Sequence, residues 1–486
     1  MDMIPYLIVS LLAPLAGPPT PQQVLNVPLK GNIVRSVAVA PDGKNVAVAA
    51  ADRTVRHWDV LARLEGTPIK VAAPVSEIAL APDAKRLAVL TNSLEMWEPE
   101  SGKRLTSFSE VTANLLAYSV DGKLVIASHR AKLLSADTGE VQVEMPEQAG
   151  WQNTCLAFSP DGTRIAAGDL AGNVWVWDTA SATLKLRRKV HVNRVTGIGF
   201  IDDGALLVSG GQDGKMTFWD MKSGREVGAM VPHGAGAGKG IAGLVCSLDG
   251  KLIVTAGAGD GTIKLWEGAS GRLRAALVDR TITWTSLALA LDGSTLAAGG
   301  KRGQDGVAMA WRLYATEPRF TSQVRPALWT ELAGDASSAY HAMLTLASQP
   351  REAVAFLSQR MRPVVLDPAM RMECDALIAV LDDETFAVRD DAYHKLEVMS
   401  PWIESHLKKA LATAKTLELQ RRLQTLITKV GGSTLPLLRA VEALEHAPGP
   451  EARKLLRRIA AGEPDARVTR EARQALERCE RLESLR

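Results

Sequence analysis

The sequence predicts an all-β propeller of seven blades followed by an all-α, helical-repeat-like domain. An Asp-Gly turn, with Asp83-Ala84 as its variant, recurs in seven copies spaced 38 to 46 residues apart along the first two thirds of the chain, and a Trp-Asp pair or a looser copy of it recurs in step in six of them. A repeat of about 40 residues with four strands per unit is typical of a propeller blade. The complete Trp-Asp pairs are Trp58-Asp59, Trp177-Asp178 and Trp219-Asp220. After about residue 317 these markers stop, and helix-start signals replace them.

Each copy follows the same order of short strands and tight turns. In residues 241–271 an apolar strand precedes an Asp-Gly turn, a second strand, another Asp-Gly turn, and a third strand that contains Trp266. Asp-Gly between apolar runs is a strong hairpin signal, because both turn positions often need positive φ. The third copy has Leu134 in place of the Trp, so we interpret it as a degenerate blade and not as a missing one.

The last copy lacks an outer strand, because its strand pattern ends at Tyr314. The segment Val24–Leu29, which precedes the first copy, has the composition of the other outer strands. Pairing this segment with the last blade predicts a closed ring of seven blades in which no inner blade is incomplete. Pro28 fits such an outer strand, because proline cannot donate a ladder hydrogen bond.

Residues 24–316 resemble the WD-repeat propeller family, and the fifth copy carries the structural tetrad of that family. The matching residues are His191, Ser209, Asp213 and Trp219. The resemblance implies an internal hydrogen-bond relay that rigidifies the blade. A His-Ser-Asp set also fits a hydrolase, but a nucleophile needs exposure and an oxyanion site, so we predict a structural role and no enzyme. The sixth copy keeps His233 but spaces Thr255 and Asp260 one residue wider, so packing is expected to hold it.

The rest of the chain predicts helices. Asp335, Pro350 and Ser433 stand where helix caps or first turns are expected. Residues 381–396 resemble a HEAT repeat, which implies a helical stack that rests on the propeller. The predicted domains are a leader or signal peptide at 1–20, the propeller at 21–316, a linker at 317–325, and the HEAT-like helical domain at 326–486.

The first residues predict export. Residues 4–16 are nearly all apolar and precede a proline-rich stretch, which favours a secretory signal over a bilayer span of about 20 residues. We therefore expect a periplasmic or cell-envelope location with no integral membrane segment in the mature chain. The alternative is the leader of a cytoplasmic protein. A leader together with a helical tail resembles bacterial exported WD-repeat proteins.

Composition excludes several other functions. The net charge of +3 gives no strong field toward nucleic acid or anionic membranes. The histidines have no metal-ligand spacing, so neither a metal nor a cofactor is expected. The glycine-rich loop at 233–240 lacks the Gly and Ser/Thr of a phosphate loop and joins two strands. Four scattered cysteines are expected to be buried free thiols: Cys155, Cys246, Cys374 and Cys479.

Three hypotheses of function follow. The favoured one is a non-catalytic scaffold for protein–protein interaction, monomeric and with protein partners of unknown identity. The second is a small-ligand binder or enzyme that uses the central channel, and it would require acids, bases or a metal directed at the axis. The third, a nucleic-acid or envelope-surface binder, would need a basic stripe. Binding residues are not identified by the sequence, although the loop at 232–240, Trp151 and Trp284 are the places to inspect.

Overall fold

The computed structural model describes residues 21–486 apart from several short stretches. These are 110–112, 120, 128–130, 147–151, 235–239, 315–324, 366–367, 400–402, 448, 465 and 485–486. The predicted leader, nearly all of the predicted linker, Trp151 and most of the glycine-rich loop therefore lie outside the described residues. Export, which depends on the leader, stays a prediction.

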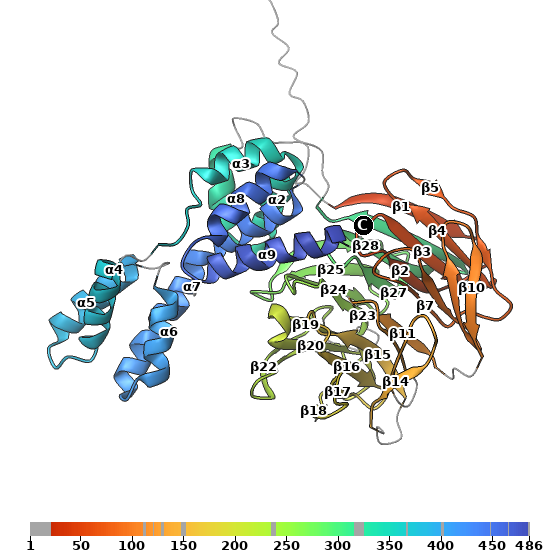
Figure 1. Ribbon diagram of the computed structural model, residues 1–486, viewed down its shortest axis with the longest axis horizontal. Coiled ribbons are helices and arrows are strands. Elements are labelled where there is room, and N and C mark those ends of the chain that lie inside the picture. Colours follow the sequence, from red (N-terminus) through yellow and green to blue (C-terminus); the bar gives the residue numbers. More distant parts are fainter. Residues whose placement is uncertain are drawn as a thin grey trace, which may run out of the picture.

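The chain from residue 22 to residue 312 forms a succession of antiparallel sheets (Figure 1). Every sheet except the last is built from strands that follow one another in the sequence. The first two sheets contain β2 (Val34–Val39), β3 (Asn45–Ala50), β4 (Thr54–Asp59), β5 (Leu64–Glu65) and β6 (Ile69–Lys70), then β7 (Glu77–Leu80), β8 (Leu87–Leu90), β9 (Leu94–Glu98) and β10 (Lys103–Phe108). The third and fourth contain β11 (Leu115–Tyr118), β12 (Leu124–Ala127), β13 (Ala131–Leu134) and β14 (Val141–Glu144), then β15 (Asn153–Phe158), β16 (Arg164–Asp169), β17 (Asn173–Asp178) and β18 (Leu184–Lys189).

The next eight strands share one continuous sheet. The last three strands form a sheet with β1, which pairs with β29. The eight are β19 (Val195–Ile201), β20 (Leu206–Gly211), β21 (Met216–Asp220), β22 (Arg225–Met230), β23 (Ile241–Cys246), β24 (Leu252–Gly257), β25 (Thr262–Glu267) and β26 (Leu273–Val278). The final sheet contains β27 (Thr283–Leu289), β28 (Thr295–Arg302), β29 (Asp305–Arg312) and β1 (Gln22–Leu29).

The first strand of each sheet stands in a closed circle. β2 contacts β7, and the contacts continue through β11, β15, β19 and β23 to β27, which packs against β2. β19 and β23 also share a ladder bridge, in which Gly197 pairs with Leu244 in parallel register. A Cβ atom at Gly197 would lie 2.5 Å from the Leu244 backbone nitrogen, so only glycine permits this contact.

The N-terminal strand completes the last sheet, as the sequence predicts. β1 runs antiparallel to β29, with Leu29 opposite Gly306 and Pro28 opposite Val307. Because β1 is the outer strand of this sheet, Pro28 removes a donor only from an open edge. The degenerate third sheet also follows the sequence, since Leu134 is 1% exposed in the position that Trp occupies elsewhere.

Helices follow the strands. Those in the described residues are α1 (Arg325–Ala333), α2 (Ala336–Ser348), α3 (Pro350–Ser358), α4 (Pro368–Ala379), α5 (Phe386–Met399), α6 (Glu404–Thr413), α7 (Leu417–His446), α8 (Pro450–Ala460) and α9 (Arg467–Ser484). Asp335 caps α2 through the backbone N–H groups of Ser337 and Ser338, and Pro350 opens α3, as predicted. None of the helices in the described residues is both long and apolar enough to cross a bilayer.

The predicted helix start at Ser433 is wrong. Thr416 caps α7 by accepting from the Leu419 backbone N–H at 3.2 Å, and the helix then runs for 30 residues through Ser433 to His446. Pro436 lies inside this helix and not at its first turn. The Ser-Thr-Leu-Pro signal therefore marks a weak point within one helix, where a backbone hydrogen bond is lost.

α7 belongs to two separate hydrophobic cores. Its first half packs in one core with α4, α5 and α6, through Leu423 and Leu426. Its second half packs through Val441 and Leu444 in a core that also contains α1, α2, α3, α8, α9 and the last two sheets. We call residues 368–427 the helical arm and the remaining described helices the helical body. In Figure 1 the body rests against the sheets, while the arm extends away from them.

Candidate functional site

A pair of buried, oppositely charged side chains joins the sheets to the helical body. Arg274 on β26 donates from Nη1 and Nη2 to the two carboxylate oxygens of Glu442 on α7, at 2.7 and 2.9 Å. The Tyr314 hydroxyl donates to the same carboxylate at 2.7 Å, and Arg274 is 1% exposed. Burial opposes ionisation of Glu442, but the Arg274 guanidinium outweighs it and holds the pKa of that carboxyl below its ordinary value.

A second pair crosses the same junction with the charges reversed. Arg439 on α7 donates from Nε and Nη2 to both carboxylate oxygens of Glu267 on β25, at 2.8 and 2.9 Å. Its Nη1 donates to the carbonyl oxygens of Leu332 and Gly334 at 2.7 and 2.8 Å. Because Arg439 and Glu442 are three residues apart, both face the same side of α7. The two bidentate pairs therefore fix both the position and the rotation of this helix on the sheets.

A third group of charges extends the junction to α9. Lys251, at the start of the second strand of the sixth repeat, lies 2.8 Å from carboxylate oxygens of both Glu445 and Glu471. Arg478 on α9 donates to the two Glu445 oxygens at 2.7 and 2.9 Å. Burial again opposes ionisation, yet Lys251 and Arg478 hold the pKa of the Glu445 carboxyl far below its ordinary value. The helical body is thus attached to the sheets through ion pairs in which each charged side chain has an oppositely charged partner.

The helical arm, in contrast, exposes apolar side chains. Met372 on α4 is 75% exposed and Val398 on α5 is 79% exposed. Every large apolar side chain exposed in the described residues after Tyr314 lies between residues 365 and 417: Val365, Met372, Phe386, Val388, Val398 and Leu417. Exposed Met and aromatic side chains are typical of surfaces that become covered by a protein partner.

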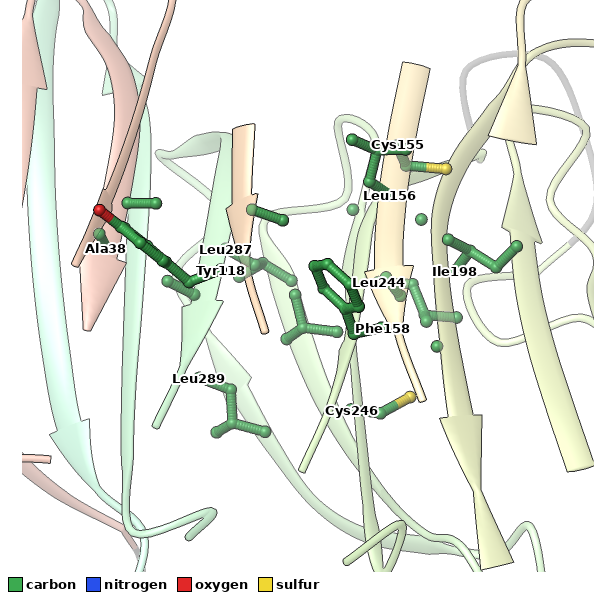
Figure 2. A pocket seen from close by; sticks show the side chains of 18 of the residues that line it. Ala38, Tyr118, Cys155, Leu156, Phe158, Ile198, Leu244, Cys246, Leu287 and Leu289 are labelled. Atoms are coloured by element: carbon green, nitrogen blue, oxygen red, sulfur yellow. The ribbon is translucent and has the colours of Figure 1, made fainter. Parts of the chain in front are cut away.

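The circle of first strands encloses a channel with a cavity volume of about 430 Å³. Figure 2 shows apolar side chains along its wall, among them Leu156, Phe158 and Leu244. Among the described residues that line it, Glu77 on β7 is the one Asp, Glu, Lys, Arg or His. The described wall therefore encloses a small apolar space in which Glu77 is the one acidic residue.

Glu77 is held in an unusual environment. The Ser36 hydroxyl donates to its carboxylate, and the Ile78 backbone N–H donates to the same hydroxyl at 3.4 Å. Desolvation by burial raises the pKa of the Glu77 carboxyl to about 7, although its hydrogen bonds act in the opposite direction. A carboxyl with a raised pKa favours the folded state fully below its unfolded pKa, near 4.3, and that contribution is lost as the pH rises through 7.

Replacing Glu77 with Gln is therefore expected to stabilise the protein more at pH 8 than at pH 5. The difference between the two pH values should be roughly 1–2 kcal/mol in the free energy of unfolding, because only the carboxylate carries the burial cost. Urea unfolding followed by circular dichroism measures it. The exposed Glu352 supplies the control, since Glu352→Gln removes a carboxylate that is not buried. Equal effects of Glu77→Gln at pH 5 and pH 8 would contradict the assignment.

The channel wall carries two thiols, those of Cys155 and Cys246. Among the described residues there is no group of three or more His, Cys, Asp and Glu side chains that could hold a metal. Cys155 and Cys246 line the channel and are partly exposed, so the prediction that both are buried is wrong. They belong to first strands, one face of which borders the open axis. Desolvation raises the pKa of Cys155 to about 12, so the thiol remains protonated and weakly nucleophilic.

The predicted tetrad residues are brought together except at one link. His191 Nε2 lies 2.9 Å from Ser209 Oγ, and His191 Nδ1 lies 3.0 Å from an Asp213 carboxylate oxygen. The buried indole N–H of Trp219 has no hydrogen-bond partner in the part of the chain that the structure describes. Burial lowers the pKa of His191 despite the Asp213 carboxylate beside it. The Ser209 hydroxyl is fully buried, which is incompatible with attack on a substrate.

The complete relay lies in the sixth repeat, which the sequence predicts to be held mainly by packing. His233 Nδ1 lies 2.9 Å from Asp260 Oδ2, and His233 Nε2 lies 2.9 Å from Thr255 Oγ1. The indole N–H of Trp266 donates to the same threonine hydroxyl at 2.9 Å. The extra residue of this repeat is absorbed by the turn, where Gly259 and Gly261 both have positive φ. The spacing of these residues in the sequence therefore did not predict that their hydrogen bonds form a complete relay.

Of the aromatic residues singled out in the sequence, Trp284 is described and is part of the core. It is 2% exposed and packs edge-to-face against Trp311, with ring centroids 6.0 Å apart. The junction residues were not identified from the sequence. No local signal separates Arg274 or Glu442 from charged residues on a solvated face, because their partners lie 168 residues apart.

Four segments of the chain match the family model of the WD domain, G-beta repeat (WD40). They are residues 20–59, 152–178, 183–220 and 230–267. The chain therefore contains WD40 repeats in its strand-rich region, and a helical C-terminal region follows them. WD40 repeats generally serve protein–protein interaction or complex assembly and are generally non-catalytic.

Curated relatives match parts of the chain. WD repeat-containing protein 1 of Bos taurus is 27% identical over 178 residues, which is 36% of this chain and 24% of the relative. Pre-rRNA-processing protein IPI3 of Yarrowia lipolytica is 36% identical over 80 residues, 16% of this chain and 17% of the relative. The 66 kDa stress protein of Physarum polycephalum is 25% identical over 221 residues, 44% and 34% respectively. The chain thus spans between 17% and 34% of the length of these relatives. All three are eukaryotic and give no support to the predicted resemblance to bacterial exported proteins.

Proposed function

We propose that residues 21–316 form a closed propeller of seven blades that acts as a non-catalytic scaffold for protein–protein interaction. The circle of contacts from β2 round to β27 supports the closed ring. The WD40 repeats support the interaction function. In this proposal residues 317–325 link the ring to the helical domain at 326–486, and the molecule is a monomer that binds protein and not nucleic acid.

The exposed apolar side chains of the helical arm are the observation that carries the proposal. They are gathered on one part of the chain, and that part has its own core, so they are displayed on a folded surface. The arm continues through α7 into the helix that the buried ion pairs hold against the sheets. A partner bound on the arm would therefore be tethered to the ring through one helix. The partner that fits is a protein that presents a complementary apolar surface.

A role of the central channel in binding a small ligand is the second candidate. The cavity of about 430 Å³ favours it, but Glu77 is the one Asp, Glu, Lys, Arg or His on the described wall. A ligand pocket usually places several polar groups around an apolar body to fix orientation. The scaffold is therefore the better supported function.

Reducing the exposed apolar surface of the arm is expected to release the partner. We expect the full-length variant Met372→Ser, Val398→Ser to retain at least tenfold less of a stoichiometric protein partner than the unaltered chain, in affinity capture followed by cross-linking and mass spectrometry. Both side chains are exposed, so folding should be unchanged. The matched control is Val227→Ser, Val278→Ser, which alters two exposed valines on outer strands β22 and β26.

Two results would contradict this assignment. If the arm variant retains the partner as well as the control does, the arm is not the binding surface. If the unaltered chain retains no protein above background, the scaffold function itself is wrong and the channel becomes the first candidate. Circular dichroism of both variants shows that neither result comes from misfolding.

A further inference from the structure

The outermost strand of the fourth sheet is strongly basic. β18 reads Leu-Lys-Leu-Arg-Arg-Lys, and its four charged side chains are all exposed: Lys185, Arg187, Arg188 and Lys189. No carboxylate lies within ion-pair distance of any of these four side chains among the described residues. Arg188 and Lys189 instead donate to the backbone carbonyl oxygens of Arg187 and Ala171. Among the described residues these charges thus lack close ion-pair partners, although Lys185 acts electrostatically on the Asp178 carboxylate.

The same strand has an open hydrogen-bonding edge. β18 pairs with β17 on one side and is the last strand of its sheet, at the rim opposite the helical body (Figure 1). An unpaired strand edge can accept an extended peptide as an additional strand. Basic side chains on such an edge discourage pairing with another neutral or basic strand, but they attract an acidic one.

The side chains of β18 are held in defined positions. The Arg187 guanidinium lies over the ring of Trp175, 4.5 Å from its centroid, and this contact fixes the side chain beside the strand. Arg187 and Lys189 share one face of the strand, about 7 Å apart. On the other face, Leu186 and Arg188 lie against Gly224 in the turn of the neighbouring sheet. Exposed Lys222 and Arg225 flank that glycine and enlarge the positive surface, while Glu226 opposes it.

We propose that β18 is a docking site for an extended acidic peptide segment of a protein partner, which adds to the sheet as a further strand. The open edge supplies backbone hydrogen bonds. Arg187 and Lys189 supply charges at the spacing of alternate residues in the added strand, so acidic residues at every second position fit best. This site goes beyond the proposed function of the arm, because it uses a different surface and recognises a different chemistry.

Single-stranded nucleic acid is the other polyanion to consider, and the surface fits it less well. Proteins that bind single strands combine positive charge with aromatic side chains on which bases stack. The aromatic residue at this site, Trp175, is buried beneath Arg187 and offers no face to a base. The backbone edge, in turn, matches the hydrogen-bonding pattern of a peptide and not that of a sugar–phosphate chain.

Fluorescence anisotropy with a defined peptide tests the proposal on the full chain. The probe is a fluorescein-labelled peptide of ten residues in which Glu alternates with Thr. We expect saturable binding that weakens at least tenfold in the double variant Arg187→Glu, Lys189→Glu. Reversal of Lys103 and Arg104 to Glu on β10, which is also an exposed outer strand, is the matched control and should change binding less than twofold. Two further probes replace Glu with Gln or carry methyl groups on alternate backbone nitrogens.

Each outcome decides between alternatives. Loss of binding by both the Gln peptide and the methylated peptide supports acidic strand addition. Undiminished binding of the methylated peptide would show that charge alone attracts the probe, and equal losses in the β10 and β18 variants would show that the site is not on β18. Either result overturns the proposal, as does tighter binding of a labelled oligothymidine than of the Glu-Thr peptide. The variants of the helical arm should leave peptide binding unchanged, so a failure here is distinct from a failure of the arm.

Discussion

Replacing Glu442 with Met is expected to lower the free energy of unfolding of the junction by about 3–5 kcal/mol, since the change leaves a buried guanidinium without its carboxylate. Arg274 would lose both bidentate hydrogen bonds, and the Tyr314 hydroxyl would lose its acceptor. The nearest remaining carboxylate, Glu267, lies 3.6 Å from Arg274 but already accepts two hydrogen bonds from Arg439. Methionine has a similar volume, so the loss reflects charge and not a cavity.

The double variant Arg274→Met, Glu442→Met separates this cause from a general defect. With both charges removed, the desolvation cost disappears, and most of the lost stability should return. The exposed pair Asp391 and Lys395 on α5 is the control, where Asp391→Asn should cost far less stability than Glu442→Met. Urea unfolding followed by tryptophan fluorescence gives the free energy of unfolding of the unaltered chain, of Glu442→Met, of the double variant and of Asp391→Asn. A double variant as unstable as Glu442→Met would contradict the ion-pair explanation.

Replacing Thr255 with Val is expected to cost about 2–4 kcal/mol in the free energy of unfolding, since two buried polar groups lose one shared partner. Thr255 Oγ1 lies 2.9 Å from both His233 Nε2 and Trp266 Nε1. Valine has the same shape without the hydroxyl, so the packing of the strand is preserved. Burial lowers the pKa of His233, so the ring is neutral at pH 7. Protonation therefore does not compensate for the lost hydrogen bond at that pH.

The fifth repeat provides the comparison for this second effect. There the Ser209 hydroxyl contacts only the His191 ring, because the Trp219 indole N–H has no partner among the described residues. Ser209→Ala should therefore cost about 1–2 kcal/mol, less than Thr255→Val. Thermal unfolding of both variants under one set of conditions gives the order. A larger loss for Ser209→Ala would show that the sixth repeat depends on packing, as its sequence spacing suggested.

The sequence predicts those features whose signals are local. The outer-strand pattern at 24–29, the hydrophobic slot of Leu134 and the cap at Asp335 each depend on a few neighbouring residues, and the structure confirms all three. The tetrad of the fifth repeat was found by spacing, whereas the better connected tetrad of the sixth was undervalued. A glycine-rich turn can absorb one extra residue without moving Asp260 away from His233.

The features that the sequence does not predict depend on contacts between distant residues. Arg274 stands on an outer strand, where a charged side chain ordinarily faces water, and only the docking of α7 makes it buried. The length of α7 was missed for a related reason. Two cores hold the two ends of the helix, and this tertiary packing overrides the break that Ser433 and Pro436 signal locally.

The pairing of β1 with β29 also sets the order of events during synthesis. Leu29 leaves the ribosome long before Gly306, its partner in the ladder. At about 5–20 residues per second, β1 waits roughly 15–60 s for β29 to be made. During that interval β1 has no ladder partner on either edge and is open to association with other nascent chains. β29 is synthesised after every other strand of the region. The pairing of β1 with β29 therefore completes the strand-rich region.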